Sequence, residues 1–141
     1  SENFEVLAKI LAQALKTNGE FSSLKDKIVI VPAPTSARHA HQRGVAHSEF
    51  MAKILARELG VETSEIIGRK SHFVQKGASA KVRKNQASKG YKILEKPQSG
   101  KIYVIFDDIC TTGATIDAIA KILRDSGAEK VWTVYLMKQK I

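Results

Sequence analysis

The stretch FDDICTTGAT, residues 106–115, brings two adjacent carboxylates together with three threonine hydroxyls around a glycine. It lies between an apolar run and an amphipathic one, so we expect it to contain a helix N-terminus with free backbone amides. Gly113 permits a tight turn and a close approach of the backbone to a ligand. Amides and hydroxyls arranged in this way suit phosphate oxygens. The Walker A pattern is excluded, because no lysine follows the glycine.

The two acids, Asp107 and Asp108, would repel a phosphate but suit a neighbouring polyol, because ionised carboxylates accept hydrogen bonds from hydroxyl groups. Vicinal hydroxyls close to a phosphate describe a ribose 5-phosphate. Successive strand residues point to opposite faces, so both acids reach one sugar only if the chain has left regular strand geometry at Asp107. We expect both carboxylates to be reachable by solvent. The alternative is a strand that ends in a turn, with Thr115 as a helix N-cap.

Composition and charge limit the class of protein. A chain of 141 residues is one domain by length, and 43% hydrophobic with 26% charged residues is typical of a globular protein. The apolar runs are too short for a membrane helix and no signal-peptide pattern opens the chain, so we expect a cytoplasmic protein. A single cysteine excludes an internal disulfide. The net charge of +9 favours an anionic partner, either nucleic acid or a polyphosphate small molecule.

The elements that must position the acids and threonines alternate between helices and strands. Apolar residues spaced three to four apart predict helices over residues 1–20, 50–59 and 116–123. Short apolar runs predict strands at residues 28–31, 65–67, 91–94, 101–106 and 131–137. This order implies an α/β fold with a central, mostly parallel sheet flanked by helices. Folds of this kind bind ligands beyond the carboxyl ends of the strands.

The stretch IYVIFDDICTTGAT resembles the signature of the type I phosphoribosyltransferases, which bind phosphoribosyl pyrophosphate (PRPP). Two further stretches, IVIVPAPTSARHAHQRGVAHSEFMAKILA and RKSHFVQKGASAKVRKN, are similar to competence-protein-F-like (ComF-like) members. The resemblance covers about residues 28–137. It implies a single-domain type I phosphoribosyltransferase fold over residues 1–141, with a flexible loop at 69–90 and a PRPP-binding motif at 102–115.

The resemblance also assigns roles to residues. Asp107 and Asp108 would bind the ribose hydroxyls, and the loop from residue 111 to 115 would bind the 5-phosphate. The implied PRPP contacts are Thr35, Ser36, Ala37, Arg38, Asp107, Asp108, Cys110, Thr111, Thr112, Gly113, Ala114 and Thr115. The amides of residues 35–38, the Arg38 guanidinium and Mg²⁺ would neutralise the leaving pyrophosphate. The residues that we assign to catalysis are Asp107, Asp108 and Arg38, and both acids would act on the metal indirectly, through PRPP hydroxyls or water.

The polar, basic segment 69–90 has no sustained period and is long for a loop in a compact domain. We interpret it as a lid that closes over PRPP and excludes water, and the loop residues assigned to it are Gln75, Lys76, Lys81, Arg83 and Lys84. Its alternatives are a solvated surface loop and a segment that follows a nucleic-acid backbone. Only Phe73 and Tyr91 offer stacking surfaces nearby, which disfavours a platform for single strands.

The reaction implied by the resemblance is Mg²⁺-dependent transfer of the 5-phosphoribosyl group to a nitrogen acceptor, a nucleobase or another amine, with release of pyrophosphate. The alternative is a non-catalytic ComF-like protein that acts in DNA uptake or senses PRPP and binds single-stranded nucleic acid. A homodimer fits either function, and membrane association is not expected. The histidines lack zinc spacing, and Cys110 is interpreted as a small filler.

Overall fold

The structure, a computed structural model, describes residues 2–34, 47–70, 90–110 and 112–138. The helices are α1 (Glu2–Lys16), α2 (Gly19–Ser23), α4 (His47–Leu59) and α6 (Ala114–Asp125), with a 3-10 turn η1 (Lys25–Lys27). The strands are β1 (Ile28–Pro32), β2 (Glu62–Thr63), β3 (Ile67–Arg69), β4 (Tyr91–Ile93), β5 (Ile102–Cys110) and β6 (Lys130–Lys138). All three predicted helices are present. The first gives way to α2, because the side chain of Asn18 caps a new helix by accepting a hydrogen bond from the amide of Phe21 at 3.0 Å.

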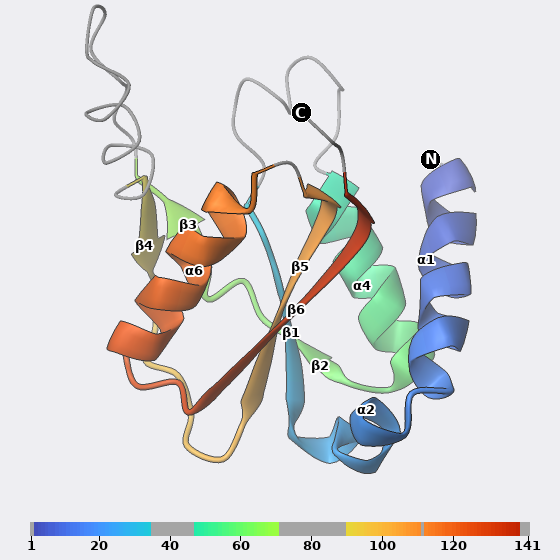
Figure 1. Cartoon of the computed structure of the whole chain (residues 1–141), viewed down its shortest axis with the longest axis horizontal. Coiled ribbons are helices and arrows are strands. Elements are labelled where there is room, and N and C mark those ends of the chain that lie inside the picture. The colour runs from blue at the N-terminus through green and yellow to red at the C-terminus, as the bar shows by residue number, and fades with distance from the viewer. Residues whose placement is uncertain (1, 35–46, 71–89, 111, 139–141) are drawn as a thin grey trace, which may run out of the picture.

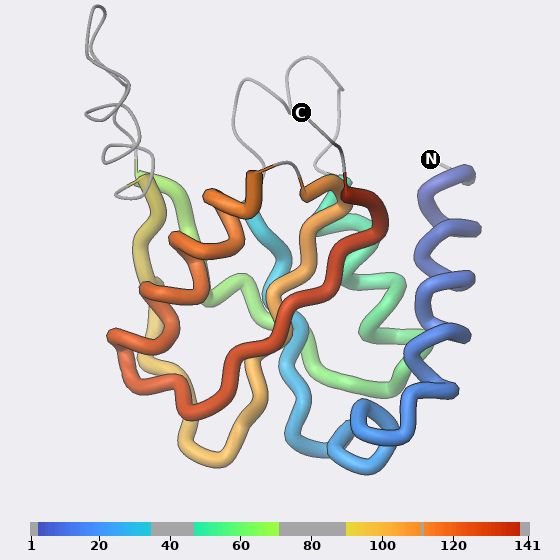
Figure 2. Tube along the Cα trace, viewed as in Figure 1, coloured from blue at the N-terminus to red at the C-terminus, as the bar shows by residue number. Residues whose placement is uncertain are grey.

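The predicted central parallel sheet is confirmed. Within the described residues its strand order is β2-β1-β5-β6, and each neighbouring pair is parallel. Figure 1 shows α1 and α4 on one side of this sheet and α6 on the other. The carboxyl ends of β1, β5 and β6 therefore share one edge, toward the top of Figure 1, and the N-termini of α4 and α6 lie at that same edge (Figure 2).

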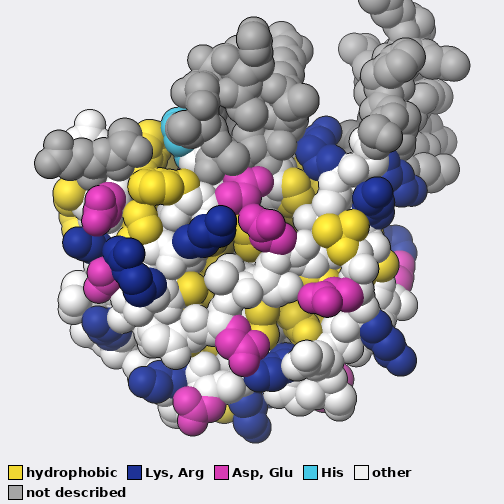
Figure 3. All heavy atoms as spheres, turned by 180° about the vertical axis from the view of Figure 1, so that it is seen from behind, with side chains coloured by type: hydrophobic (Ala, Val, Ile, Leu, Met, Phe, Trp, Pro, Cys, Tyr) yellow, Lys and Arg dark blue, Asp and Glu magenta, His cyan; other side chains and the backbone are white. Residues whose placement is uncertain are grey.

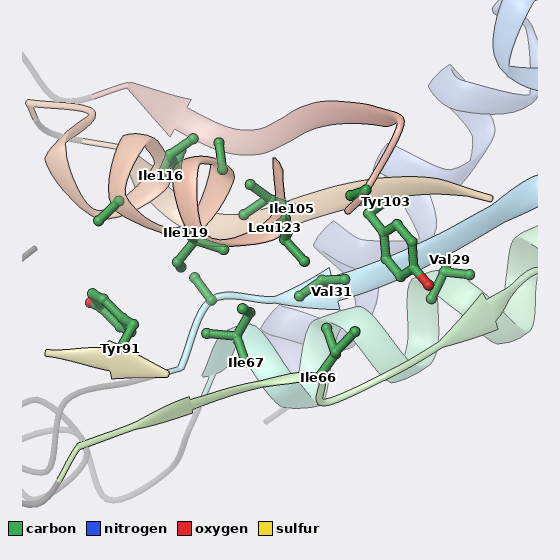
Figure 4. Close-up of a cluster of buried hydrophobic side chains, with 14 of the residues drawn as sticks. Val29, Val31, Ile66, Ile67, Tyr91, Tyr103, Ile105, Ile116, Ile119 and Leu123 are labelled. Atoms are coloured by element: carbon green, nitrogen blue, oxygen red, sulfur yellow. The ribbon is translucent and has the colours of Figure 1, made fainter. Parts of the chain in front are cut away.

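Two of the predicted strands do not join this sheet. β3 and β4 form a separate antiparallel pair, with Ile67 opposite Ile93, and the strand expected at residues 65–67 lies two residues later. The pair packs on the α6 side of the sheet through the side chains of Ile67 and Tyr91 (Figure 4). Arg69 lies over the Tyr91 ring, 5.1 Å from its centroid. This pair forms the stem of the predicted lid, whose residues 71–89 lie outside the described part of the chain.

The central strands are apolar throughout because both faces of the sheet are covered. Ile28, Ile30, Val104 and Phe106 pack with α1 and α4 in one cluster. Their neighbours on the other face, including Val31 and Ile105, pack with Ile119 and Leu123 of α6 (Figure 4). This alternation is the pleat of a strand buried on both sides. No helix within the described residues is long and apolar enough to cross a membrane.

Candidate functional site

Asp107 and Asp108 lie near the carboxyl end of β5, at the shared edge of the sheet. The sequence predicted that the strand ends at Phe106, and this was wrong. β5 stays paired with β6 through Asp107 opposite Tyr135 and as far as Cys110 opposite Lys138. Polar side chains at the strand end concealed this extension, because the pairing that continues it is made by backbone groups.

The faces of β5 nevertheless lose their strict alternation near the acids. The even-numbered residues up to Phe106 pack on the α4 side, whereas Cys110 packs on the α6 side. Ser48 of α4 contacts both carboxylates, which a regular strand would direct to opposite faces. The two acids are thus brought together, and the lost alternation agrees with the expectation that the chain leaves regular strand geometry near Asp107, although β5 itself continues to Cys110.

Ser48, in the first turn of α4, is a site residue that the sequence argument missed. Its hydroxyl Oγ lies 3.1 Å from Oδ1 of Asp107 and 3.1 Å from Oδ1 of Asp108. The backbone amide of Asp108 also points at this oxygen, at 3.5 Å. The first turn of α4 adds the positive end of its dipole, which favours neighbouring carboxylates. The only signal in the sequence was a serine just before an amphipathic run, a common and unspecific pattern.

The acids occupy different environments. Asp108 is only 7% exposed, so the expectation that both carboxylates are open to solvent was wrong for this residue. Its Oδ1 also accepts a hydrogen bond from the amide of Ile109 at 3.0 Å. Asp107 is half-buried. Burial, followed by the neighbouring Asp108, raises the pKa of Asp107 to about 7, while the Ser48 hydroxyl acts in the opposite direction.

The glycine and threonines after β5 form the entrance to α6. Gly113 has φ +81° and is the N-cap of this helix, so Thr115 is inside the first turn and is not the cap. The hydroxyl of Thr112 accepts a hydrogen bond from the amide of Ala114 at 3.1 Å. The amides of a helix's first turn have no partner within the helix, which leaves those of Thr115 and Ile116 at the open end of α6. Thr111 lies outside the described residues.

A family model described as a phosphoribosyl transferase domain matches residues 46–141, which include the acid pair and the start of α6. The chain belongs to the phosphoribosyltransferase family. It is 32% identical to the DNA utilization protein YhgH of Salmonella typhimurium over 133 residues, covering 93% of this chain and 58% of that protein. It is 27% identical to competence protein F of Haemophilus influenzae over 129 residues, covering 89% and 56% respectively. The chain therefore spans little more than half the length of these curated relatives.

The fold is that of the type I phosphoribosyltransferases. A solved purine phosphoribosyltransferase from Pyrococcus horikoshii superposes with a TM-score of 0.56 at 20% identity, over 92% of this chain and 72% of that one. At this level of identity the likeness establishes the architecture alone, because one fold serves many functions.

Several predicted site residues of this phosphoribosyltransferase-family domain lie outside the described residues. They are Thr35, Ser36, Ala37, Arg38, Gln75, Lys76, Lys81, Arg83, Lys84 and Thr111. Cys110 is a buried free cysteine packed in the α6-side core, as expected of a small filler. His47 stacks on Phe4, with ring centroids 3.9 Å apart. Among the described residues, no cluster of three or more His, Cys, Asp or Glu side chains could hold a metal ion.

Proposed function

We propose that this domain binds PRPP and transfers its 5-phosphoribosyl group to a nitrogen acceptor. The observation that carries the proposal is the placement of the acid pair. Asp107 and Asp108 share the hydroxyl of Ser48 at the carboxyl end of β5, and the N-terminus of α6 follows only a few residues later. One end of this arrangement suits two hydroxyls and the other suits a phosphate. A ribose 5-phosphate has both features.

The reaction forms a bond between the acceptor nitrogen and the anomeric carbon of the ribose, and it breaks the bond from that carbon to pyrophosphate. Pyrophosphate leaves with the bonding electrons, and the acceptor loses a proton. Positive charge develops on the sugar ring in the transition state, as in other glycosyl transfers. Carboxylates close to the ring favour that charge, and fixed contacts to the hydroxyls and the 5-phosphate orient the sugar. The domain would therefore act mainly by positioning and electrostatics.

Mg²⁺ fits this site as a companion of PRPP. Its preferred ligands are oxygens, and it is commonly held by one or two carboxylates together with substrate phosphates. Asp107 and Asp108 would act on the metal indirectly, through PRPP hydroxyls or water, and the described residues offer no cluster of three or more His, Cys, Asp or Glu side chains that could hold it without substrate. When bound, the metal would neutralise charge on the leaving pyrophosphate.

A second function, association with DNA without phosphoribosyl transfer, is favoured by the names of the relatives. YhgH is described as a DNA utilization protein and the other relative as a competence protein. The net charge of +9 is compatible with this function. However, the face seen in Figure 3 shows Lys and Arg interspersed with Asp and Glu, without a continuous basic stripe. That pattern gives a nucleic-acid backbone little to follow on this face.

Calorimetry with PRPP and MgCl₂ tests the first function. The wild-type chain should bind PRPP, and the double variant Asp107→Asn with Asp108→Asn should lose that binding while it keeps a cooperative thermal transition. Pyrophosphate release in the presence of a panel of nucleobases and simple amines then tests turnover. If the wild-type protein does not bind PRPP but binds single-stranded DNA with an affinity that falls steeply with salt concentration, the second function is supported instead.

A further inference from the structure

Ser48 and Asp108 are the two polar residues that are buried within the described part of the chain, with 3% and 7% of their surfaces exposed. They come from α4 and β5, sixty positions apart in sequence. Two hydrogen bonds join them. The serine hydroxyl donates to Oδ1 of Asp108 at 3.1 Å, and its oxygen accepts from the backbone amide of Asp108 at 3.5 Å. The same hydroxyl lies 3.1 Å from Asp107. One buried side chain therefore joins α4 to both acids.

The Ser48 hydroxyl does more than connect α4 to β5, because it contacts both carboxylates at once. Ser48 has one O–H proton and can donate it to only one carboxylate at a time, yet its oxygen is equally far from both. The arrangement keeps an oxygen of each carboxylate on the α4 side of β5. The loss of regular alternation in β5 allows the backbone to direct both groups toward this side, but mutual repulsion of two ionised carboxylates would favour their separation.

We propose that Ser48 is a positioning residue for ribose recognition, which holds Asp107 and Asp108 on one side of β5 so that both bind one vicinal diol. The inference rests on the proposed function and deepens it. Two carboxylates held together accept hydrogen bonds from two adjacent hydroxyls. Because 2-deoxyribose lacks one of these hydroxyls, the site selects ribose phosphates over 2-deoxyribose phosphates. Without the Ser48 hydroxyl, one acid can still bind a single hydroxyl of the sugar, but the two acids no longer bind both hydroxyls of the diol together.

The test compares two sugar phosphates on matched variants. Calorimetry with ribose 5-phosphate and with 2-deoxyribose 5-phosphate gives the ribose preference, and PRPP with MgCl₂ is measured in parallel. Ser48→Ala should weaken binding of PRPP and of ribose 5-phosphate roughly tenfold, the effect of one hydrogen bond to a charged group. Its affinity for 2-deoxyribose 5-phosphate should stay at the wild-type value. Ser48→Thr keeps the hydroxyl and should keep the ribose preference.

Ser64→Ala is the matched control. This hydroxyl also donates to a carboxylate, Oε1 of Glu95 at 3.3 Å. Ser64 directly follows β2, which β1 separates from β5 in the sheet, so its loss should leave all three affinities unchanged. Thermal melting confirms that each variant folds. If Ser48→Ala does not fold, Ser48→Cys takes its place, because a thiol is a weak donor of similar shape and should reduce the ribose preference.

The outcomes separate the two proposals. Wild-type protein that binds neither PRPP nor ribose 5-phosphate overturns the proposed function, and this inference with it. Wild-type protein that binds both, together with a Ser48→Ala variant of unchanged ribose preference, overturns the role of Ser48 alone. An equal loss for both sugar phosphates, not rescued by Ser48→Thr, would mean that Ser48 only supports the fold, and it would likewise overturn the inference.

Discussion

Replacing Asp107 by Asn should remove a pH-dependent loss of stability. Burial and the neighbouring Asp108 raise the pKa of Asp107 from its ordinary value of 3.8 to about 7. Between these two pH values the folded chain keeps a proton that the unfolded chain has released, so the free energy of unfolding falls as the pH rises. Below this range both states are protonated and the residue has no effect. Above it both are ionised, and the full destabilisation is present.

The size of the effect follows from the same values. Each pKa unit corresponds to about 1.4 kcal/mol, so a rise from 3.8 to about 7 sets an upper limit of roughly 4 kcal/mol. Asp107 is only half-buried, and solvent screens charges that it reaches. We therefore expect Asp107→Asn to raise the free energy of unfolding by about 1–2 kcal/mol at pH 8 relative to its effect at pH 4.

Urea unfolding of the wild type and of Asp107→Asn at pH 4, 6 and 8 measures this difference. Asp26→Asn, in the exposed turn η1 at the amino end of the sheet, is the control and should behave like the wild type throughout. If Asp107→Asn is less stable than the wild type at every pH by a constant amount, burial does not disfavour the charged carboxylate and the electrostatic reasoning fails.

Two other predictions concern ligand binding at the same edge of the sheet. The affinity of the wild type for PRPP should rise several-fold between pH 6 and pH 8, because a carboxyl group with a pKa of about 7 is mostly protonated at the lower pH. Calorimetry of Asp107→Asn is the control for the pH-dependent ionisation of PRPP itself, and this variant should show a smaller rise. An equal rise in both proteins would contradict the assignment. Gly113→Ala should lower stability by about 1 kcal/mol, since alanine disfavours the φ of +81° at this N-cap, and should weaken binding of inorganic phosphate. Asn tolerates this region better, so Gly113→Asn should be milder on both counts, and identical behaviour of the two variants would argue against the backbone explanation.

The sequence predicted the helices and the central strands well, because their apolar periods reflect burial directly. β1 and α6 each lie within two residues of the predicted bounds. The apolar pattern of the sequence could not reveal that β3 and β4 lie outside the central sheet. The strands of an antiparallel pair packed against one face of that sheet have the same short apolar runs as strands within it. Nor could it show β2, whose residues are exposed and are joined to β1 by hydrogen bonds and not by apolar packing.

The candidate site divides in the same way. The acids and the glycine of the α6 entrance were predicted, because their residue types are unusual at the end of an apolar run. Ser48 was missed because its role depends on a contact between segments about sixty positions apart, and a single serine before a helix carries no information about its distant partner. The burial of Asp108 was missed for the same reason, since the first turn of α4 covers it only in the folded chain.

The environment of the acid pair argues for a ligand independently of any sequence pattern. Two adjacent carboxylates near a buried strand end repel each other and lose hydration, and an apolar or neutral pair would serve the fold better. The Ser48 hydroxyl, the amide of Ile109 and the start of α4 limit this conflict, while burial and the neighbouring Asp108 still raise the pKa of Asp107 to about 7. Local electrostatic strain of this kind is typical of functional sites. A ligand that brings hydroxyl donors to this edge, with a metal ion beside them, would favour the charged form of both carboxylates.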